Sequence, residues 1–330
     1  MGTNMTRVLV TGGAGYIGSH ACKALALAGY DPVVVDNLSL GHADAVKWGP
    51  LEVGDIRNSA FLNKVITHYK PEAVMHFAAS STVGESVADP AKYYSNNVIG
   101  SLTLLEAVRQ NEIETFILSS TCATYGIPTC LPILESAPRN PISPYGATKL
   151  AVEHALADYG TAYGLKWAAM RYFNAAGADL DGELGERHEP ETHVIPLAIQ
   201  AALSHRPIFN VLGRDYPTPD GSAVRDYVHV ADIADAHVRA IDYLKAGGES
   251  SAFNLGTGIG TSVIEILEAV QRCTGRKLDI RFQPRRPGDP ASLYAAATRA
   301  AELLGWHPQH REIDTIVGSA VSWFRHNLAA

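Results

Sequence analysis

Two groups of residues, far apart in the sequence, are of the types that carry chemistry. Gly12, Gly15 and Gly18 follow a short apolar run and open a helical pattern. Tyr145 and Lys149 stand four residues apart in a second helical pattern, so their side chains project from one face. A glycine turn before a helix offers bare N–H groups to a pyrophosphate, and a phenol near an ammonium group can serve as a base. The two groups together suggest hydride transfer coupled to proton transfer.

The glycine turn has the context of a dinucleotide site. An apolar strand is expected at 7–10 and a helix at 16–28, with the spacing G-x-x-G-x-x-G between them. Asp36 ends the next β-branched run and lies 18 residues after Gly18. A carboxylate there accepts hydrogen bonds from ribose hydroxyls and repels a 2′-phosphate. The pattern therefore favours NAD over NADP, the alternative being a turn with an incidental solvated Asp36.

Hydroxyl groups follow the apolar strand expected at 116–118. We expect Thr121 to face the ligand crevice and to bridge a substrate hydroxyl to Tyr145. The Lys149 ammonium group and a cationic nicotinamide would both lower the pKa of the Tyr145 phenol. Two simpler interpretations remain: a Tyr-x-x-x-Lys pair arises by chance in many helices, and a Ser/Thr-rich loop often caps its own backbone.

Strand and helix patterns alternate through the first half of the chain. This predicts an α/β fold, a doubly wound parallel sheet (the NAD-binding Rossmann fold) with a smaller C-terminal α/β substrate domain. We expect the NAD-binding domain at 1–175, with a return segment near 228–255, and the substrate domain at 176–330. Residues 177–193 show no period and are expected to form a loop.

Composition excludes several function classes. The chain has 330 residues, of which 46% are hydrophobic and 18% charged, the balance of a globular protein. A net charge of -7 argues against a nucleic-acid partner. No apolar run reaches the ~18–20 residues that a membrane span needs, and no leader pattern is visible. The four scattered cysteines are expected to be reduced thiols, which indicates a cytoplasmic protein.

Longer motifs carry a resemblance that covers nearly the whole chain. The sequence resembles the extended short-chain dehydrogenase/reductase family, and within it the branch that acts on nucleotide sugars. The matching segments are 11–20, 83–87, 96–98, 145–149, 171–178, 215–229 and 285–289. The resemblance implies a homodimeric epimerase that interconverts UDP-glucose and UDP-galactose. The hexose would be oxidised transiently at C4, the 4-keto sugar would rotate, and hydride would return from NAD that stays bound through turnover.

The resemblance also assigns site residues. The catalytic residues would be Tyr145, Lys149 and Thr121. The cofactor would contact Gly12, Gly15, Tyr16, Ile17, Gly18, Asp36, Asn37, Asp55, Ile56, Phe77, Ala78, Ala79, Asn96, Tyr145, Lys149 and Phe173. The UDP-sugar would contact Thr121, Asn174, His193, Val194, Asn210, Val211, Leu212, Arg225, Arg286, Asp289 and Leu293. The arginines would bind the diphosphate, because a planar guanidinium suits phosphate oxygens.

One departure from the family pattern concerns His193, which stands where an Asn commonly contacts the sugar diphosphate. Its neighbours Glu186, His188, Glu189 and Glu191 raise the question of a metal site. Their spacing matches no metal motif that we recognise. We therefore expect a loop that contacts substrate, and no metal.

Other enzymes of the same branch remain alternatives. These are epimerases of UDP-pentoses or UDP-N-acetylhexosamines and, less favoured, 4,6-dehydratases, which typically place a carboxylate after the position of Thr121. Leu293 borders the hexose 2-substituent by resemblance, and its bulk disfavours N-acetyl groups. A non-catalytic NAD-sensing regulator is a further alternative, but such proteins usually lack the Tyr145 and Lys149 pair.

Overall fold

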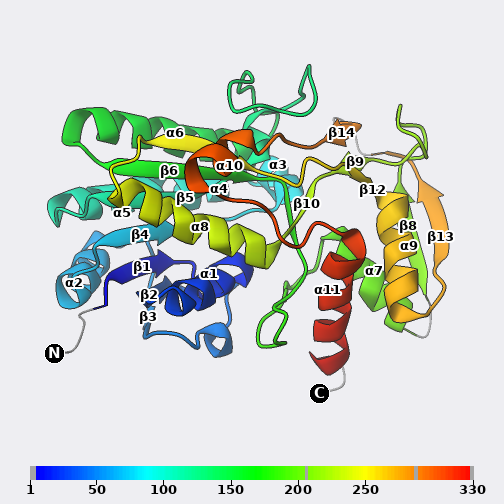
Figure 1. Ribbon diagram of the computed structural model, residues 1–330, viewed down its shortest axis with the longest axis horizontal. Coiled ribbons are helices and arrows are strands. Elements are labelled where there is room, and N and C mark those ends of the chain that lie inside the picture. Colours follow the sequence, from blue (N-terminus) through cyan, green and yellow to red (C-terminus); the bar gives the residue numbers. More distant parts are fainter. Residues whose placement is uncertain (1–4, 205–206, 286–288, 328–330) are drawn as a thin grey trace.

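The structure is a computed structural model that describes residues 5–204, 207–285 and 289–327 (Figure 1). The first part of the chain forms β1 (Arg7–Thr11), α1 (Tyr16–Leu27), β2 (Asp31–Asp36), η1 (Ala43–Ala45), β3 (Leu51–Val53), α2 (Ser59–Tyr69), β4 (Ala73–His76), α3 (Val83–Ala88), α4 (Pro90–Tyr93), η2 (Tyr94–Ile99), α5 (Gly100–Gln110), β5 (Thr115–Thr121), η3 (Cys122–Thr124), α6 (Pro144–Tyr163) and β6 (Lys166–Tyr172).

The second part forms β7 (Asn174–Ala176), α7 (Val194–Leu203), β8 (Ile208–Leu212), β9 (Val224–Arg225), β10 (Tyr227–His229), α8 (Val230–Lys245), β11 (Ser251–Leu255), β12 (Thr261–Ser262), α9 (Val263–Thr274), β13 (Asp279–Gln283), β14 (Ser292–Leu293), α10 (Thr298–Leu304) and α11 (Ile313–Asn327). None of the described helices is long and apolar enough to cross a membrane.

A parallel sheet of seven strands organises the larger part of the molecule, in the order β11-β6-β5-β4-β1-β2-β3. Its order reverses beside β1, which creates the crevice where doubly wound folds bind ligands. The predicted α/β doubly wound sheet is thus confirmed. The chain returns to this sheet late, because β11 pairs with β6 at the edge.

Helices cover both faces of this sheet (Figure 1). Val8 and Val10 of β1 point into a core shared with α1 and α8, whereas Leu9 points into a second core shared with α2, α5 and α6. Alternate residues of a strand face opposite sides, so an almost continuous apolar run marks a strand buried on both. β1 therefore lies between the two helical layers, and its carboxyl end opens on the crevice.

The smaller part lies at the right in Figure 1 and has its own core. Helices α7, α9 and α11 pack together with the two-stranded sheet of β8 and β13. A three-stranded sheet, β12-β9-β14, lies between this core and the large sheet. Residues 177–193 form neither helix nor strand, as predicted.

Candidate functional site

The glycine turn between β1 and α1 fits a dinucleotide. Gly12 has φ +76°, and a Cβ there would lie 2.5 Å from the Ala78 backbone nitrogen. A Cβ on Gly18 would lie 2.2 Å from the Gly12 carbonyl oxygen. The helix begins after Gly15, and no described side chain caps its first turn. The N–H groups of that turn, Tyr16 and Ile17 included, are therefore the donors that a pyrophosphate needs.

Asp36 ends β2 beside this turn. Its Oδ2 accepts from the Ala14 N–H at 3.0 Å and its Oδ1 from the Leu38 N–H at 2.8 Å, so both oxygens are fixed in place. Burial raises the pKa of Asp36, against these bonds. A carboxylate oxygen that has accepted one hydrogen bond can accept another, which leaves capacity for ribose hydroxyls.

Asp55 follows the neighbouring strand β3. The hydrogen bonds from the Arg57 guanidinium lower the pKa of Asp55 to about 2, so it is ionised at neutral pH. Asn37 lies against it, with 3.5 Å between the Asn37 Nδ2 and an Asp55 oxygen. Two carboxylates thus lie along the carboxyl ends of β2 and β3, where a 2′-phosphate would be repelled.

The other predicted cofactor residues follow strands of the same sheet or lie in its helices. Ile56 comes after β3, Phe77, Ala78 and Ala79 come after β4, Asn96 lies in η2 and Phe173 comes after β6. The Phe77 and Ala78 N–H groups both donate to the Thr11 carbonyl, at 2.8 and 3.0 Å. The segment after β4 is therefore held against the glycine turn.

Thr121 and the two helix residues come together at the carboxyl end of β5. Ser143 caps α6 by accepting from the Gly146 N–H at 3.2 Å, and this start sets Tyr145 and Lys149 in the first two turns. The Thr121 side chain lies near the Tyr145 phenol and lowers its pKa. Thr121 also accepts from a backbone N–H of η3 at 3.1 Å, so the simpler capping role is realised as well. Thr121 thus acts on the Tyr145 phenol at the carboxyl end of β5.

The electrostatics of this pair differ from the expectation. Burial raises the pKa of Tyr145 well above its ordinary value, and the nearby Tyr172 adds to the effect, although Thr121 opposes it. The Lys149 Nζ donates to the Ser119 carbonyl at 2.8 Å, and burial lowers the pKa of Lys149 to about 8, against the effect of Glu153. Burial therefore outweighs the lowering effect of Thr121 on the pKa of the phenol, and the effect of Lys149 expected from the sequence stays a prediction.

Arg225 and Asp289 form the centre of the predicted nucleotide site. They are joined by an ion pair, and the Arg225 side chain is only 13% exposed. Leu293 of β14 is the register partner of Arg225 on β9, which brings a third predicted residue alongside. Asn174 begins β7, and its N–H donates to the Asp226 carbonyl at 3.0 Å, next to Arg225. The third charged residue, Arg286, lies outside the described residues.

Residues 210–212, which by resemblance would contact the UDP-sugar near its uracil, lie in strand β8. Val211 is 1% exposed and packs in the core of the smaller part, so its side chain faces away from any ligand. Asn210 is exposed and Leu212 is partly exposed. Any contact of Val211 with a ligand must therefore come from its backbone, because alternation in the strand buries its side chain.

His193 immediately precedes α7, and Val194 is the first residue of that helix. The His193 Nδ1 lies 2.8 Å from a Glu186 oxygen and 2.9 Å from a Glu191 oxygen. Burial lowers the pKa of His193, but the two carboxylates outweigh it and raise it to about 10. His193 therefore interacts first with two carboxylates of its own loop.

Comparison with known proteins agrees with this arrangement. Residues 8–256 match the NAD dependent epimerase/dehydratase family. The chain belongs to this family. It is 56% identical over 316 residues to the UDP-glucose 4-epimerase of Rhizobium meliloti (strain 1021), and the alignment covers 96% of each chain.

Solved structures of epimerases superpose on nearly the whole chain. The UDP-glucose 4-epimerase from Brucella ovis in complex with NAD is 55% identical, with a TM-score of 0.94 over 97% of this chain and 98% of that chain. The UDP-glucose-4-epimerase from Stenotrophomonas maltophila with bound NAD and formylated UDP-arabinopyranose is 39% identical, with a TM-score of 0.95 over 98% and 100%.

The structure also places near the candidate site two residues of this epimerase/dehydratase chain, Tyr216 and Asn97, that the sequence analysis did not assign to it. The Tyr216 hydroxyl is buried and has no hydrogen-bond partner among the described residues, and the charges of Asp289 and Arg225 act on it. Asn97, next to the predicted Asn96, is buried and bonds the Ser80 N–H and carbonyl at 2.8 and 2.9 Å. Both residues lie in segments that match the family pattern, 96–98 and 215–229, but the sequence does not show their burial, which is a tertiary property.

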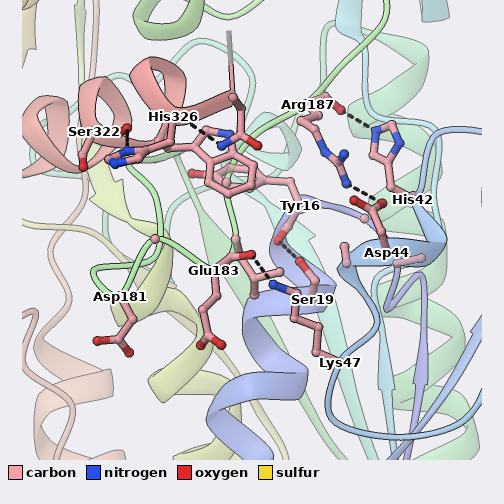
Figure 2. Close-up of a pocket in the computed structure, with 18 of the residues that line it drawn as sticks. Tyr16, Ser19, His42, Asp44, Lys47, Asp181, Glu183, Arg187, Ser322 and His326 are labelled. Atoms are coloured by element: carbon pink, nitrogen blue, oxygen red, sulfur yellow. Dashed lines mark hydrogen bonds and ion pairs between the residues drawn. The ribbon is translucent and has the colours of Figure 1, made fainter. Parts of the chain in front are cut away.

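A cavity of about 570 Å³ lies beside Tyr16 (Figure 2). It is lined by the start of α1, the η1 segment, the 180–187 loop and α11. Figure 2 shows Arg187 directed at Asp44, a pair at 2.7 Å, and His42 near the Arg187 carbonyl at 3.2 Å. These contacts hold the 177–193 loop against the part of the protein that carries the glycine turn.

Proposed function

We propose that this chain interconverts UDP-glucose and UDP-galactose, with NAD bound tightly and regenerated in each turnover. One observation carries the proposal: Thr121 at the end of β5 and Tyr145 at the start of α6 lie at the same carboxyl edge of the sheet as the glycine turn. The resemblance to epimerases crystallised with NAD, one of them with a UDP-sugar derivative, supports the choice of cofactor and substrate class.

In this proposal Tyr145 moves the proton of the sugar 4-hydroxyl. Thr121 would bridge the two groups, so the proton would pass through two hydrogen bonds, from the sugar hydroxyl to Thr121 and from Thr121 to Tyr145, without bulk water. NAD supplies, when bound, an acceptor that takes the C4 hydride and returns it. Burial leaves the Tyr145 phenol with a raised pKa, and the positive charge of a bound nicotinamide would oppose that effect.

Inversion at C4 requires a firm hold on UDP and a loose hold on the hexose. Arg225 is nearly buried and carries two donors suited to a diphosphate, and Asp289 beside it suits ribose hydroxyls. We infer that Tyr216, whose buried hydroxyl is unpartnered among the described residues, joins them. Binding energy from the nucleotide then confines a 4-keto sugar that is free to turn.

The proposed role of Tyr145 is tested by replacing it with phenylalanine. Purified wild-type protein, given UDP-galactose without added NAD, should form UDP-glucose, and Tyr145→Phe should be slower by about 10²–10⁴-fold. Binding of UDP should stay the same in the variant. Conversion by Tyr145→Phe at the wild-type rate would refute the assignment.

Parallel assays with UDP-xylose and UDP-N-acetylgalactosamine define the substrate range. Leu293, beside Arg225, is the residue that we expect to disfavour the N-acetyl group. We also keep as proposals a homodimer, a cytoplasmic location, and a division of the chain into a cofactor domain at 1–175 and a sugar-nucleotide domain at 176–330. The four free cysteines agree with a reducing compartment.

A further inference from the structure

The loop between β7 and α7 contains the same short pattern twice. Glu186 and His188 form one Glu-x-His pair, and Glu191 and His193 form another. The fold turns the two pairs toward each other, so that one ligand atom from each of the four side chains lies within 4.8 Å of the other three. Spacing along the sequence does not show this, because the loop has no regular period.

The distances between these atoms suit a small coordination sphere. The His193 Nδ1 lies 2.8 Å from a Glu186 oxygen and 2.9 Å from a Glu191 oxygen. The His188 Nδ1 lies 3.1 Å from the same Glu186 oxygen and 3.8 Å from the other Glu191 oxygen. Ligands of tetrahedral zinc, at ~2.0–2.2 Å from the metal, stand about 3.4 Å from one another. The observed separations fall on both sides of that value.

The negative charges of Glu186 and Glu191 also favour a bound cation. The Glu186 and Glu191 side chains are each only 6% exposed, and two carboxylates so close and so buried need positive charge between them. Arg187, the cation between Glu186 and His188 in the sequence, pairs instead with Asp44 (Figure 2). The compensating charge must therefore come from protonated imidazoles or from a cation held by neutral ones.

We propose that Glu186, His188, Glu191 and His193 bind one divalent transition metal, with zinc the best match. Two imidazole nitrogens and two carboxylate oxygens form a mixed set that zinc accepts, whereas magnesium and calcium prefer oxygen ligands alone. His193 is half exposed, which gives the ion a route from solvent. The alternative is a network of ion pairs without metal, which the experiment below separates from this proposal.

The position of the site assigns the metal a structural role. The His188 ring stands edge-on to the Tyr16 ring, with 6.4 Å between the centroids, and Tyr16 begins the helix of the glycine turn. The Tyr16 hydroxyl donates to the Gly177 carbonyl at 2.6 Å, at the start of the same loop. His193 ends the loop at the N-terminus of α7. A metal there fixes the loop between the cofactor-binding and sugar-binding parts.

The test uses the full chain, with any affinity tag removed, and measures metal directly. Protein treated with a chelator and then dialysed is titrated with Co²⁺ and with Zn²⁺. We expect about one ion per chain by elemental analysis, intense visible Co²⁺ bands typical of four-coordinate geometry, and a higher unfolding temperature with Zn²⁺. A wild-type chain that takes up neither ion in stoichiometric amount refutes the proposal and leaves the ion-pair network.

Variants locate the ion. His188→Gln should weaken Zn²⁺ binding by at least about 100-fold and remove the Co²⁺ bands, since it deletes a ligand outside the proposed catalytic and substrate contacts. His154→Gln is the matched control, because His154 is an exposed histidine on α6 and should bind like wild type. Equal binding by all three proteins would refute this site. Circular dichroism checks the fold of His188→Gln, and the wild-type titration decides the proposal by itself if that variant fails to fold.

Discussion

Replacing Gly12 by alanine tests whether the glycine turn between β1 and α1 binds the cofactor, and the same change at Gly29 is a matched control. Both glycines have positive φ, +76° and +82°, so a Cβ at either costs about 1–2 kcal/mol of backbone strain. A Cβ on Gly29 meets nothing within 4 Å, whereas one on Gly12 lies 2.5 Å from the Ala78 nitrogen. The two variants therefore have similar backbone strain, but only Gly12→Ala also brings a Cβ too close to the Ala78 nitrogen.

The collision at Gly12 has a definite partner. The Ala78 N–H donates to the Thr11 carbonyl at 3.0 Å, and an added Cβ must displace it. A buried donor that loses its acceptor costs about 1–3 kcal/mol. We expect Gly12→Ala to lose about 2–5 kcal/mol of unfolding free energy and Gly29→Ala about 1–2 kcal/mol.

Urea unfolding followed by circular dichroism measures the stabilities, and the nucleotide released on denaturation measures bound NAD. Gly12→Ala should be purified with little NAD, because the segment after β4 is pushed from the glycine turn. Gly29→Ala should retain the wild-type amount. Equal urea midpoints and full NAD content in both variants would refute the fit of the glycine turn to a dinucleotide.

Three further predictions follow from the site. Lys149→Met should lower kcat most below pH 8. Burial lowers the pKa of Lys149 to about 8, so the wild-type ammonium group is lost above that pH and the ratio of the wild-type kcat to the variant kcat should shrink there. A ratio that stays constant with pH would contradict this. Tyr216→Phe should raise KM for UDP-galactose about tenfold or more with kcat nearly unchanged, because losing a hydrogen bond to a charged group costs about 1.5–3 kcal/mol. An unchanged KM would count against that contact. Glu153→Gln should lower the unfolding free energy by about 3–5 kcal/mol, because it breaks the buried ion pair with Arg171. Glu106→Gln, in an exposed ion pair, should change urea unfolding little. Equal urea midpoints for the two variants would argue against the buried pair as the cause.

The sequence predicted what depends on local pattern. The glycine turn, the acid at Asp36 and the helix that carries Tyr145 all stand where periodicity and spacing place them. The parallel sheet follows from the alternation of strands and helices, whereas the order of its strands comes from the structure. Short elements such as α3, α4 and α10 have too few turns to show a period and were missed.

What tertiary packing decides could not be predicted. The raised pKa of Tyr145 comes from its burial, which the residues around it in the sequence do not show. Val211 was expected beside a base, but its place in β8 turns the side chain into the core. The convergence of Glu186 and His193 joins two ends of an aperiodic loop. In each case the deciding contact is with residues distant in the sequence or in a segment without periodic structure.

The central claim is that the hydrogen at C4 of the sugar leaves and returns within one closed site. UDP-galactose labelled with deuterium at C4 is incubated with purified protein in ordinary water without added NAD, and the products are analysed by mass spectrometry and NMR. The account predicts UDP-glucose that keeps the deuterium at C4. Loss of the label to solvent, or no conversion by protein shown to contain NAD, would contradict it.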